Sequence, residues 1–64
     1  MNFTQIEKIL IKNGWKLLRT LGSNCQYGKY GYDKTVIIHN YGQEDLPLDM
    51  VKHLEKITGL SLLR

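Results

Sequence analysis

The chain of 64 residues is long enough for one small domain, residues 1–64, and too short for two hydrophobic cores. Hydrophobic residues make up 42% and charged residues 23%, which is ordinary for a globular protein and favours a folded chain over a disordered one. Nine lysines and arginines against six aspartates and glutamates give a formal net charge of +3, a balance that suits a polyanionic partner. The single cysteine excludes an internal disulfide and a cysteine-rich zinc site.

No segment has the basic and then apolar pattern of an export signal, and no apolar run reaches the length of a membrane span. We therefore expect a cytoplasmic protein with no membrane partner. Two histidines and one cysteine at their separations do not form a metal signature. Gly22-Ser23 lacks the glycine–lysine sequence of a nucleotide-binding loop. The expectation is a protein without a metal or a small-molecule cofactor.

A helix from Thr4 to Lys12 is the first predicted element. Thr4 and Glu7 have the spacing of a capping box, in which each side chain satisfies a backbone N–H at the helix start. Apolar residues then recur with helical spacing, at Ile6, Ile9 and Leu10. Asn13-Gly14 predicts the helix end, because glycine tolerates the left-handed conformation found there.

Three strands are predicted next: Trp15–Thr20, Cys25–Tyr30 and Lys34–His39. The turns between them are short, which favours an antiparallel meander over parallel pairing. Pro47 fits the first turn of a second helix, and Gly59 fits its end, with Leu60 folding back. The buried face of that helix is predicted to contain Met50, Val51, Leu54 and Ile57. Residues 61–64 form a tail that is a candidate contact strip for a partner.

The order of these elements is α-β-β-β-α, an α+β class. Two amphipathic helices cover one face of a three-stranded antiparallel sheet, and the other face remains exposed for binding. This is the double-stranded-RNA-binding-domain-like arrangement.

Basic residues concentrate before position 35, and tyrosines are interleaved with the later ones. The basic residues are Lys8, Lys12, Lys16, Arg19, Lys29 and Lys34, and the tyrosines are Tyr27, Tyr30, Tyr32 and Tyr41. Lysines and arginines bind phosphate, and exposed aromatic rings stack on unpaired bases. Solubilising charge and cross-strand packing are the alternatives. We expect Trp15 in the core and His53 on the surface.

Several segments also carry a resemblance to a known family. They are Asn13-Gly14-Trp15, Arg19 to Asn24, Tyr27, Thr35 to Ile38, Gly42 to Pro47, and Ile57-Thr58-Gly59-Leu60 at a helix end. In this order and spacing, across nearly the whole chain, they resemble the HicA family of small bacterial toxins.

The resemblance implies an endoribonuclease (an mRNA interferase, which needs no metal) that is neutralised by a HicB-type antitoxin. In that family a histidine follows a Gly-Ser turn at the start of the second strand, usually as Gly-Ser-His-His or Gly-Ser-Asn-His. This chain reads Gly22-Ser23-Asn24-Cys25 there. We assign the histidine position to Cys25, so no imidazole stands at it.

Metal-independent RNA cleavage needs a general base for the 2′-hydroxyl and cations for the phosphate. Three interpretations of Cys25 stay open: a packed strand residue, a replacement base or nucleophile, and a loss of catalysis. His39 is the possible substitute, since it ends the third strand beside a loop that often contains histidine in relatives. The residues expected to bind RNA are Lys16, Arg19, Ser23, Asn24, Tyr27 and Lys29.

The sequence therefore supports two functions. The first is an RNA-cutting toxin that binds messenger RNA and a HicB-type antitoxin. The second is a catalytically inactive RNA-binding or antitoxin-binding module of the same fold.

Overall fold

The protein has five secondary-structure elements, seen in a computed structural model that describes residues 1–62. They are α1 (Phe3–Lys12), β1 (Trp15–Leu21), β2 (Asn24–Lys29), β3 (Val36–His39) and α2 (Leu48–Thr58). The α-β-β-β-α order confirms the predicted α+β, double-stranded-RNA-binding-domain-like fold. Every predicted element is present. The ends of the three strands lie within two residues of the predicted ends.

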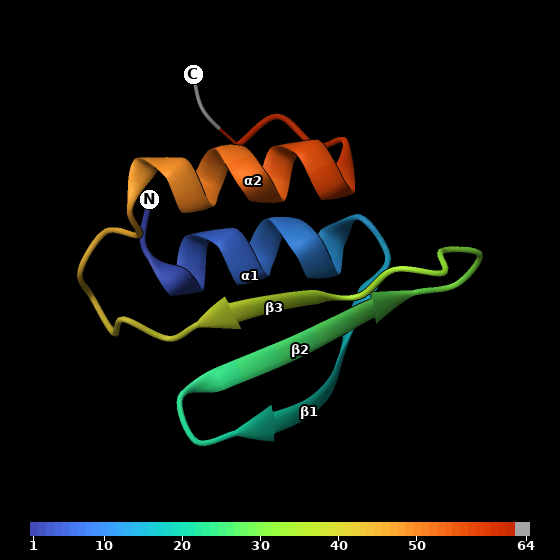
Figure 1. The fold of residues 1–64 in the computed structure, drawn as a ribbon, viewed down its shortest axis with the longest axis horizontal. Coiled ribbons are helices and arrows are strands. Elements are labelled where there is room, and N and C mark those ends of the chain that lie inside the picture. The colour runs from blue at the N-terminus through green and yellow to red at the C-terminus, as the bar shows by residue number, and fades with distance from the viewer. Residues whose placement is uncertain (63–64) are drawn as a thin grey trace.

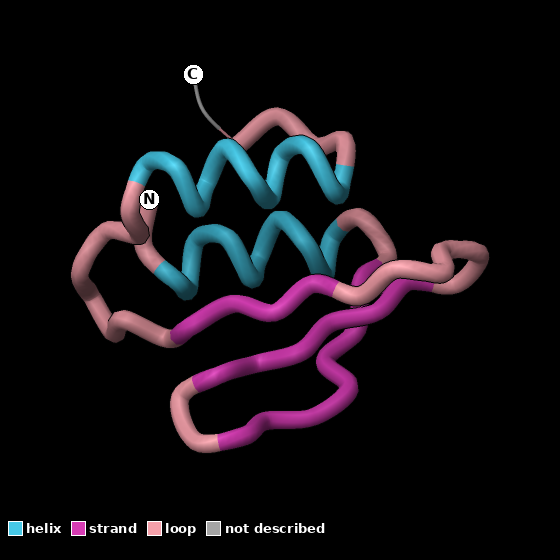
Figure 2. Tube along the Cα trace, in the orientation of Figure 1, coloured by secondary structure: helices cyan, strands magenta, loops and turns pink. Residues whose placement is uncertain are grey.

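The three strands form one antiparallel sheet in the order β1-β2-β3. Both helices lie on the same side of this sheet (Figure 1). The loop between β2 and β3 extends beyond the end of the sheet (Figure 2). Neither helix among residues 1–62 is both long enough and apolar enough to cross a membrane.

The core fills the space between the helices and the covered face of the sheet. The sheet contributes Trp15, Cys25, Tyr27, Val36 and Ile38, and the helices contribute Phe3, Ile6, Leu10, Val51 and Leu54. Leu46 and Leu62 complete the buried hydrophobic set of the described residues. Trp15 is 1% exposed, which confirms its predicted place in the core.

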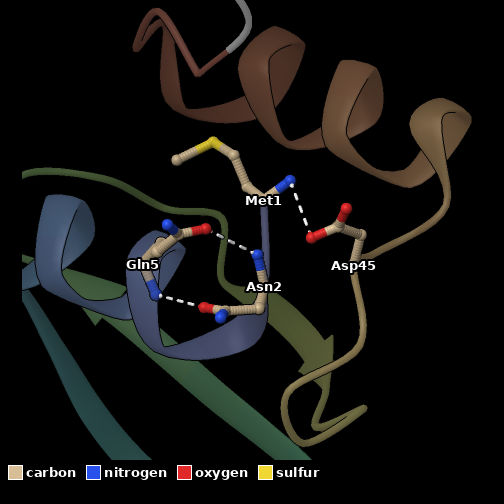
Figure 3. A network of polar contacts seen from close by, with 4 residues as sticks. All are labelled: Met1, Asn2, Gln5 and Asp45. Carbon is tan, nitrogen blue, oxygen red and sulfur yellow. Dashed lines mark hydrogen bonds and ion pairs between the residues drawn. The ribbon is translucent and has the colours of Figure 1, made fainter.

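The N-terminus of α1 differs from the prediction. Asn2, not Thr4, is the N-cap: its Oδ1 accepts from the Gln5 N–H at 3.0 Å, and the Gln5 Oε1 accepts from the Asn2 N–H at 2.9 Å (Figure 3). The predicted Thr4–Glu7 capping box is therefore wrong. The chain before the helix is held extended by a bridge from Asn2 to Asp45 and by the Met1 amino group, 3.4 Å from the Asp45 carboxylate. This anchor puts Asn2 in the capping position.

Helix α2 follows the prediction more closely. Pro47 is its N-cap and Gly59 its C-cap, with a φ of 72° that glycine adopts without strain. Val51 and Leu54 are buried as expected, whereas Met50 and Ile57 are only partly buried. Leu60 also packs against the core. Of the candidate contact strip at 61–64, residues 63 and 64 lie outside the described residues, and Leu62 is buried in the core.

Candidate nucleic-acid interface on the outer sheet face

A bulge in β1 decides which side chains share the exposed face of the sheet. Lys16 pairs with Gly28 and Leu17 with Tyr27, but the register then shifts by one residue at Leu18, so that Arg19 pairs with Gln26. In a regular strand the side chains of Lys16 and Arg19 would point to opposite faces of the sheet. The extra residue brings both side chains to the face opposite the helices. We call this the outer face. It is formed by Lys16, Leu18, Arg19, Leu21, Asn24, Gln26, Ile37 and His39.

A chain of hydrogen bonds orients the guanidinium of Arg19 across the outer face. Its Nε donates to the Gln26 Oε1 at 2.6 Å, and the Gln26 Nε2 donates to the Thr35 Oγ1 at 2.9 Å. A guanidinium has further N–H donors in a planar fork, which suits phosphate oxygens. The sequence alone did not single out Gln26 or Thr35. Gln26 lies between Cys25 and Tyr27, which are both buried, and this alternation places the Gln26 side chain on the outer face.

A second polar pair lies at the end of the outer face, where β2 begins and β3 ends. Asn24 and His39 are directly paired, and the Asn24 Oδ1 lies 3.1 Å from the His39 Nδ1. The Tyr41 ring contacts the imidazole edge to face, with 4.7 Å between the ring centroids. His39 is half-buried and Asn24 is exposed. An imidazole is therefore present on the outer face, although it comes from β3.

Cys25, by contrast, lies on the covered face of the sheet. It is 7% exposed, it pairs with Thr20 and Ile38, and its Sγ is 4.0 Å from the Thr20 hydroxyl. A small buried strand residue was one of the three interpretations of this cysteine, and the geometry supports that one. Its catalytic role stays a prediction.

The remaining predicted site residues do not all gather with Arg19. Lys29 is on the covered side with Trp15, where its Nζ lies 5.1 Å from the centre of the Tyr32 ring, a cation–π contact. Ser23 is exposed in the turn before β2, and its carbonyl accepts from the Asn40 N–H at 2.7 Å. The outer face thus holds Lys16, Arg19 and Asn24 of the predicted RNA-binding set, with Ser23 next to it.

Tyr27 has no ring face available for stacking on a base, because it is completely buried beneath α1. Its hydroxyl donates to a carboxylate oxygen of Glu7, the residue expected to cap α1. Burial, followed by the neighbouring Glu7 carboxylate, raises the pKa of the Tyr27 hydroxyl well above its usual range. The role of Tyr27 as an RNA-binding residue is therefore corrected to one of core packing. Tyr30, the first residue after β2, is fully exposed.

We expect Tyr27 to make folding sensitive to alkaline pH. Because its pKa is higher in the folded chain, the unfolded chain loses this proton first, and stability falls as the pH rises above about 10. Chemical unfolding at about pH 9 and about pH 11 should show a larger loss for the native chain than for Tyr27→Phe. Tyr30→Phe, which alters an exposed tyrosine, should keep the native profile. Equal losses in the native chain and Tyr27→Phe would contradict the assignment.

Other candidate sites are few. Within residues 1–62, no group of three or more histidine, cysteine, aspartate or glutamate side chains is arranged to hold a metal ion. His53 is exposed on α2, as predicted. A surface hollow along α1 contains none of the predicted site residues and is lined by Thr4, Glu7, Lys8, Ile9, Ile11 and Lys12.

The outer face also displays large apolar side chains, which sequence analysis did not assign to the site. Leu18, Leu21 and Ile37 are each more than half exposed. Leu18 lies over Gly28, where an added Cβ would come within 2.8 Å of its Cδ1. Exposed apolar groups beside cationic and amide groups are typical of a surface that meets another macromolecule.

The fold and this face define a small α+β protein of the double-stranded-RNA-binding-domain-like class, with one side of its sheet open. A protein-family model for the HicA toxin of bacterial toxin–antitoxin systems matches residues 3–60. The chain therefore belongs to the HicA toxin family and is a toxin of a toxin–antitoxin system. No curated protein matches the chain.

Proposed function

We propose that this toxin is an endoribonuclease that binds single-stranded messenger RNA across the outer face, and that a HicB-type antitoxin inhibits it by covering the same face. Family membership supports a toxin with an antitoxin partner. The compartment that contains messenger RNA in a bacterium is the cytoplasm, and we propose that the toxin acts there.

The observation that carries this proposal is the composition of the outer face. Arg19 is tied to Gln26 by a 2.6 Å hydrogen bond, which orients a charge that is exposed to solvent. Lys16 adds a second exposed charge on the same strand. Two cations on one strand suit successive phosphates of an extended RNA, and the exposed apolar groups beside them suit unstacked bases.

Inhibition by the antitoxin follows from the same surface. A protein that covers Leu18, Leu21 and Ile37 removes apolar area from water, and acidic groups opposite Lys16 and Arg19 complement its charge. RNA and antitoxin then compete for one face. A HicB-like reading frame immediately downstream of the toxin gene is the arrangement that this partnership predicts.

The second candidate is a module that binds RNA or antitoxin without cutting. One observation favours it: the Gly22-Ser23-Asn24-Cys25 turn contains no imidazole, and the Cys25 thiol is buried. The outer face and its partners would be the same in both cases. Cleavage of RNA by the purified chain separates the two functions.

The first experiment measures binding of a labelled single-stranded RNA with 2′-O-methyl groups, which cannot be cut, at low salt. We expect binding that weakens as salt is added, because counterions are released from the RNA. The HicB-type protein encoded beside the toxin should displace the RNA. Cleavage is then measured with unmodified RNA. A chain that neither binds nor cuts RNA would overturn the proposed function.

A further inference from the structure

The outer face contains one imidazole, and its surroundings are those of an oriented base. His39 lies at the end of β3 with its Nδ1 3.1 Å from the Asn24 Oδ1. An amide oxygen only accepts hydrogen bonds, so the Nδ1 must carry the proton in this contact. The neutral ring then has its lone pair on Nε2. Among residues 1–62, Nε2 of His39 makes no hydrogen bond.

We propose that His39 is the catalytic base of RNA cleavage in this chain, and that Asn24 and Tyr41 are positioning residues that hold its imidazole with Nε2 available to the substrate. This inference rests on the proposed RNA-cleaving function. Asn24 selects the tautomer, and the edge-to-face contact with Tyr41 restricts rotation of the ring. The proposed base therefore lies at the end of β3, whereas the histidine of the family follows the Gly-Ser turn at the start of β2.

The alternatives for this role are on the wrong side of the sheet. Cys25 faces the core, 7% exposed, beneath the helices. His53 is on α2, and both helices lie on the covered side (Figure 1). His39 shares the outer face with Lys16 and Arg19. A base needs to reach the substrate hydroxyl while a cation meets the same phosphate, and the outer face places His39 on the same side of the sheet as Lys16 and Arg19.

The chemical step uses the RNA itself as nucleophile. The Nε2 of His39 takes the proton of a 2′-hydroxyl, the 2′-oxygen bonds to the adjacent phosphorus, and the bond from phosphorus to the 5′-oxygen breaks. The leaving 5′-oxygen takes a proton from water, and the imidazolium returns its proton to the resulting hydroxide. The products are a 2′,3′-cyclic phosphate and a 5′-hydroxyl. Arg19 stabilises the charge that develops on the phosphate oxygens.

The activity test compares His39→Gln with His53→Gln, a matched change on the opposite side of the molecule. His39→Gln should slow cleavage of unmodified RNA by about 100-fold or more, the range that general bases contribute. It should bind 2′-O-methyl RNA within about twofold of the native chain, because the cations that meet the phosphates are unchanged. His53→Gln should cut and bind like the native chain. Circular dichroism checks that each variant is folded.

The positioning role is tested by NMR correlations between the ring nitrogens and carbons of His39, which distinguish the two neutral tautomers without any substrate. The native chain should have Nδ1 protonated. Asn24→Asp keeps the acceptor and should keep this tautomer, whereas Asn24→Ala should shift the ring toward the Nε2-protonated form and slow cleavage. Tyr41→Phe keeps the ring contact and should keep activity, and Tyr41→Ala should lower it.

Each failure has a different signature. If His39→Gln cuts RNA at the native rate, the inference is wrong while the nuclease function stands. Loss of cleavage in a folded Cys25→Ala chain, with His39→Gln still active, would return the role to Cys25. If the native chain binds RNA but does not cut it, catalysis fails and the binding module remains. An Nε2-protonated His39 in the native chain would overturn the positioning role of Asn24.

Discussion

Leu10→Ala is expected to lower the free energy of unfolding by about 2–5 kcal/mol, because it leaves a cavity in the core. Leu10 is 0% exposed and packs between α1 and the sheet. A domain of this size has a total stability of roughly 3–10 kcal/mol, so the variant should lose a large share of its stability. Urea unfolding followed by circular dichroism measures the change.

Leu21→Ala makes the same chemical change on the outer face, where Leu21 is 62% exposed. Its unfolding free energy should stay within about 0.5 kcal/mol of the native value. The two leucines therefore separate the core from the binding surface. A similar loss in both variants would mean that the outer face is covered in the free protein, in conflict with the open sheet.

Reversing the two cations of the outer face should have the largest effect on binding. The double variant Lys16→Glu/Arg19→Glu is expected to weaken binding of single-stranded RNA by at least about tenfold at low salt. The slope of log affinity against log salt should become shallower by about 1.4, about 0.7 for each phosphate of a single strand that the chain no longer neutralises. Association with the antitoxin should weaken as well, because the same charges face its acidic groups. Fluorescence anisotropy with 2′-O-methyl RNA measures the first effect.

The control is Lys8→Glu/Lys52→Glu, which changes the net charge of the chain by the same amount. Both lysines are exposed and lie on the helices. This variant should keep most of the RNA affinity and the native salt slope. Equal weakening in the two double variants would show that binding follows total charge rather than the outer face, and would contradict the proposed interface.

Local sequence signals were sufficient for the elements and their order. Asn13-Gly14 and Gly59 end their helices as predicted, with positive φ at both glycines. The short turns between strands produce the antiparallel meander, because a parallel connection needs a longer crossover. These features depend on near neighbours in the chain, which the sequence displays directly. The cap at Asn2 was missed because two pairs, Asn2 with Gln5 and Thr4 with Glu7, have the same capping-box spacing in the sequence. The bridge from Asn2 to Asp45, which is far away along the chain, accompanies the first pair.

The membership of the site depended on contacts between strands. Alternation predicts that Cys25 and Tyr27 share a face, but it does not state whether that face meets the helices or solvent. Pairing and burial assign both to the core and assign Asn24 to the outer face, beside His39.

The sequence by itself determined the family, the α-β-β-β-α order and the basic character of the first half of the chain. Only the tertiary structure decided which side chains form the outer face. The bulge at Leu18 brings Lys16 and Arg19 together, and the pairing of β2 with β3 brings His39 to Asn24. The physical reason is that a single extra residue in a strand reverses the orientation of every later side chain, and its position depends on the neighbouring strand.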